Sequence, residues 1–391
     1  MSRRAPLVGI VGAGPAGLVI AHVLQRSGIP FVLFERQGAD GLRARVKAGM
    51  IEHRTVELLE RHGLAGPILD GGSRIGTCEF RADGESFVLD YARLCGGIGH
   101  YIYPQHLLVG DWAEQLVAAG GDVRFAAMVT QVVQTDEAVE VLAVDAAGDT
   151  SSVDCDVVAC CDGATGVLSA GVNDASIAYP CRWLTLIARA PPSTEGTVYG
   201  LHRSGFAGQM HRSATMTRFM LEVPVDDGYD EWPDDRIRSA LEERLAAAGR
   251  PPVQHGEFVE RDVLDHRVRV CDSMQDGRLF YVGDAAHLIT PAGGKGMNMA
   301  IQDAVELASG LCERYGEPAD GSRLAGYSQT RLPRVWRHQE FSNLMLSLFI
   351  AGGPGRREPF GYGLCRARLD QIVNDPLYSR WFARAYVGID D

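Results

Sequence analysis

The sequence predicts an α/β protein with a dinucleotide-binding domain built on a parallel sheet, an inserted and largely antiparallel β domain, and a helical C-terminal region. Three observations support this prediction. A glycine-rich turn joins an apolar run to an amphipathic helix near the N-terminus, residues 180–223 are rich in β-forming segments, and residues 331–391 have helical patterning. Strands that alternate with helices are typical of parallel sheets, whereas successive strands are typical of antiparallel ones.

The N-terminal strand, turn and helix occupy residues 7–24, LVGIVGAGPAGLVIAHVL. The turn has the pattern G-x-G-x-x-G in its expected setting, after an apolar run and before a helix. Gly12 permits the tight turn, Gly14 lets the backbone approach a pyrophosphate, and Gly17 lets the helix pack closely on the strand. The phosphates would bind at the helix N-terminus, where unpaired N–H groups favour an anion.

A second apolar run, residues 31–34, ends at Glu35. This acid lies at about the offset where a carboxylate binds the adenosine ribose hydroxyls, so the segment strengthens the prediction of a dinucleotide site. A loop with several basic residues follows, and it could meet either phosphate or solvent. Its basic residues are Arg43, Arg45 and Lys47.

Composition excludes several other classes of protein. A net charge of -12 over 391 residues argues against nucleic-acid and anionic-membrane partners. The longest apolar stretch contains glycines, a proline and His22, which suits a nucleotide-binding turn better than a membrane span. Nine cysteines without a C-x-x-C pair favour reduced thiols in a cytoplasmic protein and indicate no metal site. No signal peptide is recognised.

Two further blocks place a glycine-rich turn after a buried strand. The strand at 156–160 ends at Asp162-Gly163, and the strand at 279–282 ends at Gly283-Asp284. A loop at 290–296 and a long helix from Met297 to about Glu313 follow the second of these turns. The other predicted elements are helices at 55–62, 107–119 and 234–248, a hairpin at 74–90 that turns at 82–84, and two or three antiparallel strands at 123–144.

These three blocks, in this order, resemble the FAD-dependent aromatic hydroxylases, or group A flavoprotein monooxygenases, of the 4-hydroxybenzoate 3-monooxygenase type. The resemblance runs nearly from end to end. It implies that residues 1–177 begin a Rossmann-like FAD-binding domain, that 178–269 form the inserted substrate-binding domain, and that 270–391 complete the FAD-binding domain and supply a helical dimer region. The hairpin at 74–90 could join the substrate sheet. Local matches include Tyr103 with Gln105, Arg212-Ser213-Ala214-Thr215, Lys295-Gly296 with Asn298, and Tyr386-Val387-Gly388.

The resemblance implies hydroxylation of a phenolic benzoate. NAD(P)H reduces FAD, O2 forms a C4a-hydroperoxyflavin, and the distal oxygen attacks the activated ring. A phenol has a pKa near 10, so its deprotonation needs a positioned acceptor. By the resemblance, Tyr199 touches the substrate hydroxyl, Tyr386 is the second tyrosine of a relay, and the Pro291 carbonyl faces the phenol. Arg212 matches the arginine that holds the substrate carboxylate by a two-pronged hydrogen bond.

The resemblance also assigns cofactor contacts. Asp284 takes a ribityl hydroxyl, and the helix that begins near Gly296 aims N–H groups at the flavin pyrimidine ring, where negative charge grows on reduction. NADPH is the expected donor, with NADH left open because Thr165 and Gly41 replace two family contacts. The expected cofactor residues are Gly12, Gly14, Ala16, Gly17, Glu35, Arg36, Gln37, Arg45, Lys47, Gln105, Asp162, Arg267, Asp284, Gly296, Met297 and Asn298.

Further departures from the family pattern concern the substrate contacts and the proton relay. Met210 and Met220 stand where the family has a serine and a tyrosine that bind the carboxylate. Methionine adapts to irregular shapes, so the alternative substrate is an amino-hydroxybenzoate, of the 3-amino-4-hydroxybenzoate type, attacked at a different ring carbon in a biosynthetic pathway. No histidine occurs at 73–75, where the family has its proton-relay histidine, so the proton could leave through water or Arg74.

Other functions compete with this interpretation. A flavin halogenase would need a W-x-W-x-I-P motif, which the five tryptophans do not form. A plain NAD dehydrogenase would not need the second and third blocks. A flavin-bound regulator without activity stays open, although the intact Tyr199, Arg212 and Tyr386 argue against it. The expected partners are therefore a small aromatic acid, O2 and a second copy of the chain.

Overall fold

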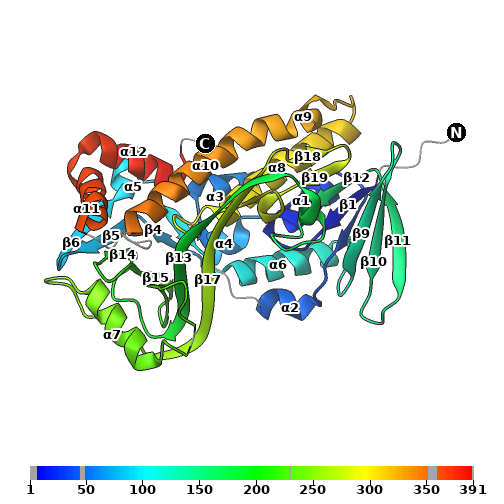
Figure 1. Ribbon diagram of the computed structural model, residues 1–391. Coiled ribbons are helices and arrows are strands. Elements are labelled where there is room, and N and C mark those ends of the chain that lie inside the picture. Colours follow the sequence, from blue (N-terminus) through cyan, green and yellow to red (C-terminus); the bar gives the residue numbers. More distant parts are fainter. Residues whose placement is uncertain (1–6, 45–48, 229, 351–358, 390–391) are drawn as a thin grey trace. The chain divides into compact units, whose positions relative to one another are not determined.

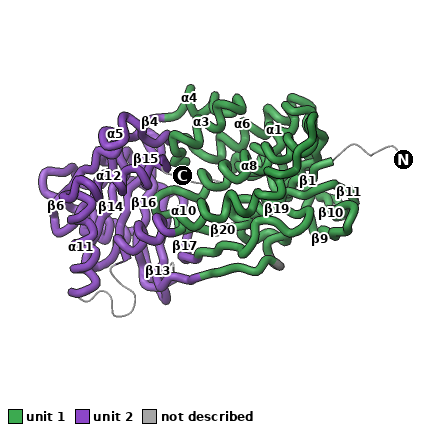
Figure 2. The backbone as a smooth tube through the Cα atoms, turned by 90° about the horizontal axis from the view of Figure 1, so that it is seen from above, with its two compact units in different colours: residues 1–72, 103–176, 268–339 green, residues 73–102, 177–267, 340–391 purple. Residues whose placement is uncertain are grey.

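The computed structural model describes residues 7–44, 49–228, 230–350 and 359–389. The chain forms two compact units, and each is assembled from three separate segments (Figure 2). Unit 1 comprises residues 1–72, 103–176 and 268–339, and unit 2 comprises residues 73–102, 177–267 and 340–391. Among the described residues, no helix has the length and hydropathy needed to cross a membrane.

The central sheet of unit 1 has the strand order β18-β19-β12-β1-β2-β8 (Figure 1). Every neighbouring pair from β19 to β8 is parallel, and β18 runs antiparallel to β19. The strands β1, β2 and β12 are short, apolar and buried throughout, as expected for a parallel sheet covered on both faces. The strands are β1 (Val8–Val11), β2 (Phe31–Phe34), β8 (Val123–Arg124), β12 (Val157–Cys160), β18 (Gln275–Asp276) and β19 (Leu279–Tyr281).

Helices surround this sheet, and a small antiparallel sheet of order β11-β10-β9 extends unit 1. The segment predicted as two or three antiparallel strands at 123–144 divides differently, because β8 joins the parallel sheet beside β2. The helices are α1 (Pro15–Arg26), α2 (Ala39–Ala44), α3 (His53–Arg61), α4 (Gly66–Gly71), α6 (Gln105–Ala118), α8 (Gly296–Tyr315) and α9 (Ser322–Ala325). The remaining strands are β3 (Met50–Ile51), β9 (Met128–Gln134), β10 (Val139–Val144), β11 (Thr150–Cys155) and β20 (His287–Leu288), with short 3-10 helices at Leu168–Gly171 and Gly283–Ala285.

A large sheet forms the core of unit 2, in the order β17-β13-β16-β15-β14-β5-β6. It is largely antiparallel, and the β14–β5 pair is parallel. β20 pairs with the end of β17 that belongs to unit 1, at Arg269 and Val270. The strands are β5 (Thr77–Ala82), β6 (Glu85–Asp90), β13 (Asp174–Arg189), β14 (Thr197–Leu201), β15 (Ala207–Ser213), β16 (Met216–Val223) and β17 (Glu257–Cys271).

The register of this sheet decides which side chains share a face. Tyr199 on β14 pairs with Gly208, Gly208 pairs with Met220, and Met220 pairs with Thr185. Residues directly opposite one another point to the same face, so these four form one row. Their sequence neighbours point the other way, into a core closed by α7 (Asp234–Leu245). That core includes Leu184, Leu186, Val198, Ala207, Phe219, Leu221, Ile237 and Leu241.

Unit 2 also contains the C-terminal helices. The helix α10 (Tyr327–Phe349) passes from unit 1 into unit 2, and α5 (Tyr91–Leu94), α11 (Pro359–Asn374) and α12 (Pro376–Val387) lie in unit 2. Residues 340–391 therefore group with the large sheet in unit 2, while the predicted assignment of 270–391 to the FAD-binding domain and a dimer region stays a prediction. Aromatic packing explains this grouping, because Phe349 stacks on Tyr199 and Phe382 packs on Phe80.

The predicted hairpin at 74–90 is shorter than expected. β5 and β6 form a hairpin that turns at Asp83 and Gly84, both with positive φ, and β5 joins the large sheet beside β14. Residues 73–75 instead form β4 (Ser73–Ile75), which pairs antiparallel with β7 (His100–Ile102). The predicted fold class is confirmed: a mixed α/β protein with a parallel nucleotide-binding sheet, an inserted, largely antiparallel sheet and C-terminal helices.

Candidate active site

The expected cofactor residues of unit 1 gather at the carboxyl ends of its parallel strands. β1 leads to Gly12, β2 to Glu35, β12 to Asp162, and β19 to the turn that contains Asp284. The chain leaves β1 toward β2 on one side, and β12 lies on the other side, so the sheet has its topological switch point at β1. Ligands of open α/β sheets bind outside the carboxyl ends at such a point.

The glycines of the first turn fit a dinucleotide. A Cβ on Gly17 would lie 1.9 Å from the Gly12 carbonyl oxygen, so helix and turn touch through backbone. Gly12 has φ +103°, and a Cβ there would lie 2.4 Å from the Cys161 carbonyl oxygen. At Gly14, by contrast, no described atom lies within 4 Å of the ideal Cβ. That position therefore faces open space, which a pyrophosphate can approach.

Two carboxylates border this turn. Glu35 is buried, and its oxygens accept hydrogen bonds from the backbone N–H groups of Ala13, at 2.7 Å, and Gln37, at 2.9 Å. Each carboxylate oxygen has a second lone pair, so ribose hydroxyls can still bind. Asp162 accepts a hydrogen bond from the Leu168 N–H through Oδ2, while its buried Oδ1 has no hydrogen-bond partner among the described residues. This orphaned acceptor fits a hydroxyl donor from a bound cofactor.

Burial raises the pKa of Asp162, and the nearby Arg36 and Arg269 oppose that effect.

The other expected cofactor residues lie in different surroundings. Arg36 is exposed, Ala16 is buried in the first turn of α1, and Gln105 begins α6. Arg267 is an exposed residue of unit 2. Arg45 and Lys47 lie outside the described residues. The nicotinamide contacts expected of these basic residues stay predictions.

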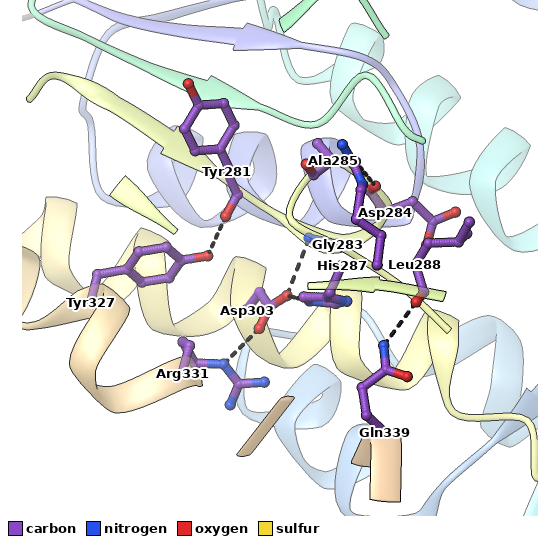
Figure 3. Close-up of polar contacts among 11 residues, drawn as sticks. Tyr281, Gly283, Asp284, Ala285, His287, Leu288, Asp303, Tyr327, Arg331 and Gln339 are labelled. Carbon is purple, nitrogen blue, oxygen red and sulfur yellow. Dashed lines mark hydrogen bonds and ion pairs between the residues drawn. The ribbon is translucent and has the colours of Figure 1, made fainter. Parts of the chain in front are cut away.

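The turn that carries Asp284 is fixed by a buried charge network (Figure 3). Asp303 on α8 accepts hydrogen bonds from the Gly283 N–H at 3.1 Å, His287 Nε2 at 2.5 Å and Arg331 Nε at 2.6 Å. Asp303 is fully buried, yet Arg331 and His287 hold its pKa at about 2 against the effect of burial. Arg269 donates to the carbonyls of Asp284 and Ala285. The backbone of the turn is thus held by these hydrogen bonds, and they place the half-buried Asp284 at the end of β19.

A second ion pair fixes the start of α8. Lys295 Nζ lies 2.6 Å from Glu52 Oε1, and both side chains are buried. Asn298 Oδ1 accepts from the Glu52 N–H, and its amide nitrogen donates to the carbonyls of Met50 and Gly294. The Asn298 side chain therefore binds the backbone of the loop, and its expected contact with the cofactor stays a prediction. Gly296 and Met297 begin α8 and present the free N–H groups of a helix N-terminus.

The predicted tyrosine pair is brought together in unit 2. The hydroxyl oxygens of Tyr199, on β14, and Tyr386, on α12, lie 2.8 Å apart. The Tyr199 ring stacks between Phe80, at a centroid distance of 5.5 Å, and Phe349, at 4.9 Å. Burial raises the pKa of both tyrosines above the ordinary value, and either hydroxyl can be the donor of their hydrogen bond.

The predicted arginine, Arg212, lies on the same sheet as Tyr199, near a second arginine, Arg218, that sequence reasoning missed. Arg212 is the extra residue of a bulge in β15, between the pairs of His211 and Ser213 with β16. Burial and the positive charge of Arg218 lower the pKa of Arg212, and the negative charge of Glu260 raises it. Burial also lowers the pKa of Arg218, while Glu260 and Asp262 raise it. Both guanidiniums are thus partly buried and near one another, with acidic residues of β17 close to them, and the expected part of Arg212 in substrate binding stays a prediction.

The two methionines lie on the face that carries Tyr199. Met210 pairs with Arg218, and Met220 pairs with Gly208, so the four side-chain positions form adjacent rows. Met220 is buried, and its Cε would lie 3.1 Å from a Cβ on Gly208. It therefore occupies the space above a residue without a side chain. The position of Arg218 beside Met210 follows from the register of β15 and β16, and nothing in the sequence indicates this pairing.

The Pro291 carbonyl, predicted to face the phenol, accepts a hydrogen bond from the Gly294 N–H at 3.0 Å. The carbonyl oxygen has a second lone pair, and its expected contact with the phenol stays a prediction.

Arg74, the residue proposed for proton exit, lies over the Tyr101 ring and donates to the Gly97 carbonyl. A buried histidine that sequence reasoning missed, His100, lies directly across the β4–β7 ladder from Ile75.

Comparison with known proteins identifies the family. A family described as "FAD binding domain" matches residues 6–342. The p-hydroxybenzoate hydroxylase of Acinetobacter baylyi is 30% identical over 387 residues, which cover 98% of this chain and 95% of that protein. The crystal structure of p-nitrophenol 4-monooxygenase from Pseudomonas putida DLL-E4 superposes with a TM-score of 0.81, at 22% identity over 97% of each chain. A complex of aklavinone-11 hydroxylase with FAD and aklavinone gives a TM-score of 0.75, at 21% identity over 92% of this chain and 71% of that one. The chain therefore belongs to the FAD-dependent aromatic hydroxylases, in the family that includes p-hydroxybenzoate hydroxylase.

Proposed function

We propose that this enzyme hydroxylates a phenolic benzoate of the 4-hydroxybenzoate type, with NAD(P)H as electron donor and O2 as oxidant. The observation that carries the proposal is the hydrogen bond between Tyr199 and Tyr386, at 2.8 Å, with Tyr199 on the sheet that also carries Arg212. The tyrosine pair suits a phenol, and Arg212 suits a carboxylate. The relative at 30% identity is a p-hydroxybenzoate hydroxylase, which supports the same substrate class.

The tyrosine pair would move the phenol proton. A bound phenol would donate its proton to the Tyr199 hydroxyl, while Tyr199 passes its own hydrogen on to Tyr386. The phenol oxygen would then carry the negative charge. Because both tyrosines are buried and their pKa values are raised, neither is charged by itself at neutral pH. They act as aligned hydroxyls that exchange hydrogens, and a phenolate ring is the more reactive nucleophile.

The arginines would bind and orient the acid. A guanidinium forks onto a carboxylate through two charge-assisted hydrogen bonds, and an anion relieves the repulsion between Arg212 and Arg218. When FAD is bound, it supplies electron transfer from the nicotinamide and the activation of O2. The protein groups at the strand ends, from Gly14 to Asp284, would hold it, and the N-terminus of α8 favours negative charge.

The two methionines favour a second candidate within this class, a benzoate that carries an additional ring substituent such as an amino group. Met220 is buried and Met210 is half-buried, in rows adjacent to Tyr199 and Arg218. Thioethers make weak hydrogen bonds at best, so they would leave the carboxylate to the arginines. Their flexible side chains can fit a bulkier ring.

We also infer that the enzyme is a homodimer that uses the C-terminal helices. α11 exposes Phe360 and Leu364, and α12 exposes Leu377 and Trp381. Each pair is spaced by four residues, so each forms one apolar stripe on its helix. The measured mass of the purified protein in solution tests this, and a monomer at micromolar concentration contradicts it.

One experiment separates the two substrates. Flavin reduction and product formation are measured with NADPH and with NADH, in the presence of 4-hydroxybenzoate, its amino- and hydroxy-substituted relatives, or no acid. Stimulation and hydroxylation by 4-hydroxybenzoate supports the first candidate, and response only to a substituted acid supports the second. If no phenolic benzoate stimulates NAD(P)H consumption, the proposal fails.

A further inference from the structure

The last carbonyl groups of α12 need partners outside the helix, and one of them belongs to the catalytic tyrosine. A helix leaves its last four carbonyls without intrahelical donors. The Gly388 and Ile389 N–H groups turn back to the carbonyls of Ala385 and Arg384, with Gly388 at φ +72°. The carbonyl of Tyr386 instead meets His100 Nε2 at 3.0 Å. A side chain from β7 thus caps the helix end that carries Tyr386.

The contact fixes the imidazole tautomer. A carbonyl can only accept, so His100 Nε2 must carry a hydrogen and donate it to Tyr386. His100 Nδ1 is then an acceptor, and it lies 3.2 Å from the Tyr91 hydroxyl, whose single hydrogen has two acceptors in reach, Nδ1 and the Ile75 carbonyl at 2.8 Å. Ile75 is the residue directly opposite His100 in the β4–β7 ladder. The imidazole is therefore fixed at Nε2 by the Tyr386 carbonyl, and Nδ1 contacts the Tyr91 hydroxyl.

Ring packing fixes the Tyr386 side chain as well as its backbone. The rings of Tyr91, His100 and Tyr386 contact one another pairwise, edge to face, at centroid distances of 5.3, 4.9 and 5.2 Å. All three side chains are at most 1% exposed. Edge-to-face pairs favour one relative orientation of the rings. His100 therefore limits both the height of Tyr386 along the helix axis and the direction of its ring.

We propose that His100, supported by Tyr91, is the positioning residue that aligns the Tyr386 hydroxyl with that of Tyr199, and so sets the ionisation of the bound phenol. This inference rests on the proposed role of the tyrosine pair. The hydroxyl separation of 2.8 Å is near the most favourable distance for an O–H···O bond, and a small displacement of Tyr386 weakens it. His100 makes no direct contact with the substrate in this proposal.

The test uses two substitutions that remove different parts of His100. His100→Phe keeps a ring and loses the donor to Tyr386, whereas His100→Gln keeps a donor and loses the ring. His266→Phe is the matched control, since His266 is equally buried in unit 2, packs on Trp183 at 4.3 Å, and has no hydrogen-bond partner at either nitrogen among the described residues. The probe is 4-hydroxybenzoate, whose phenolate absorbance reports the ionisation of the bound ligand as pH is varied.

His100→Phe should raise the apparent pKa of the bound phenol and slow hydroxylation at saturating acid by about tenfold to a hundredfold, since small misplacements of a catalytic group have effects of this size. FAD affinity and flavin reduction should not change. His100→Gln should restore part of the lost rate, and His266→Phe should match the wild type. Unchanged ionisation in His100→Phe, or equal losses in His100→Gln and His100→Phe, would overturn the proposal.

Tyr91→Phe is the second variant, for the case that substitution of His100 prevents folding. It removes the partner of Nδ1 and leaves the ring, so it should shift phenol ionisation in the same direction by a smaller amount. No shift would count against the proposal. Tyr199→Phe and Tyr386→Phe are measured in parallel. If these two leave ionisation and rate unchanged, the proposed role of the pair has failed, and not only the role of His100.

Discussion

The hydroxyl oxygens of Tyr199 and Tyr386, which are 187 residues apart in the sequence, lie 2.8 Å from one another in a buried aromatic cluster. One comes from a strand of the large sheet and the other from the last turn of α12. Both hydroxyls lie in buried, aromatic surroundings, where an unpaired hydroxyl is costly. The pairing satisfies both groups and creates a short path for a proton.

Tyr199→Phe should slow hydroxylation by about a hundredfold, because general acid–base groups contribute at least this much. Flavin reduction by NAD(P)H should change little, since the hydroxyl acts on the substrate. Stopped-flow measurement of the two half-reactions checks this. Tyr179→Phe is the control, as Tyr179 lies on β13 and donates to Asn343. An unchanged hydroxylation rate in Tyr199→Phe would remove this residue from the reaction.

Arg212→Ala should weaken binding of the aromatic acid by about 2–5 kcal/mol, the usual loss when one partner of a buried charge pair is removed. FAD binding should be unaffected. Arg218→Ala should weaken the same acid, because it shares the local positive charge. Ligand titration followed by flavin fluorescence measures both constants.

Arg189→Ala serves as the control for the two arginine variants. Arg189 and Glu257 are both largely exposed, with N and O atoms 3.5 Å apart, so their pair should have little effect on acid binding. Equal losses of acid and FAD affinity in Arg212→Ala would show that Arg212 supports the fold and does not bind the substrate.

Met210→Ser combined with Met220→Tyr should improve turnover of 4-hydroxybenzoate, because the new hydroxyls can each add a hydrogen bond of about 0.5–1.5 kcal/mol to the carboxylate. Steady-state kcat/KM for 4-hydroxybenzoate and for an amino-substituted acid gives the comparison. The preference for the substituted acid should fall in the double variant. No gain with 4-hydroxybenzoate would mean that these positions do not select the substrate.

Gly14→Ala should leave the stability of the FAD-free protein almost unchanged while weakening FAD binding by about tenfold or more, a loss of about 1.4 kcal/mol. The ideal Cβ at Gly14 meets no described atom within 4 Å, yet it would stand where a pyrophosphate approaches. Thermal unfolding of the apoprotein and FAD titration separate the two effects.

Gly17→Ala is the contrasting variant in this test. Its Cβ would lie 1.9 Å from the Gly12 carbonyl oxygen, so the apoprotein itself should lose about 1–3 kcal/mol of stability. If Gly14→Ala binds FAD as tightly as the wild type, the glycine-rich turn does not hold the pyrophosphate.

Asp303→Asn should lower the free energy of unfolding at pH 7 by about 3 kcal/mol, because it leaves Arg331 buried without its anion. The pKa of Asp303 is lowered from its ordinary value near 4 to about 2, so ionised Asp303 stabilises the fold above pH 4. That contribution is lost as pH falls toward 2. Unfolding measured against pH should therefore show a difference between variant and wild type that shrinks below pH 4.

The control for this variant is Asp320→Asn. Asp320 is exposed and its pKa is lowered by hydrogen bonds from Ser322, so its removal should not weaken the turn at Gly283. A difference between Asp303→Asn and the wild type that stays constant from pH 7 to pH 2 would show that the carboxylate charge is not what stabilises this turn. FAD affinity should fall in Asp303→Asn and stay unchanged in Asp320→Asn.

The sequence by itself determined the nucleotide-binding half of the protein. The glycines of the first turn, Glu35, Asp162 and Asp284 each follow an apolar strand, and local chain geometry is enough to predict that such residues meet at one edge of a parallel sheet. The order of those blocks also indicated the family. These features are local, because a turn, a strand end and a helix start are each encoded within a few residues.

Tertiary structure decided which distant side chains meet. The register of β15 and β16 places Arg218 beside Met210, the bulge at Arg212 shifts that register, and α12 brings Tyr386 to Tyr199. His100 reaches the C-terminus of α12 from a strand whose partner is residues 73–75, a pairing with no local signal in the sequence. Strand pairing and helix docking depend on burial summed over the whole core, so contacts of this kind follow from packing and cannot be read along the chain.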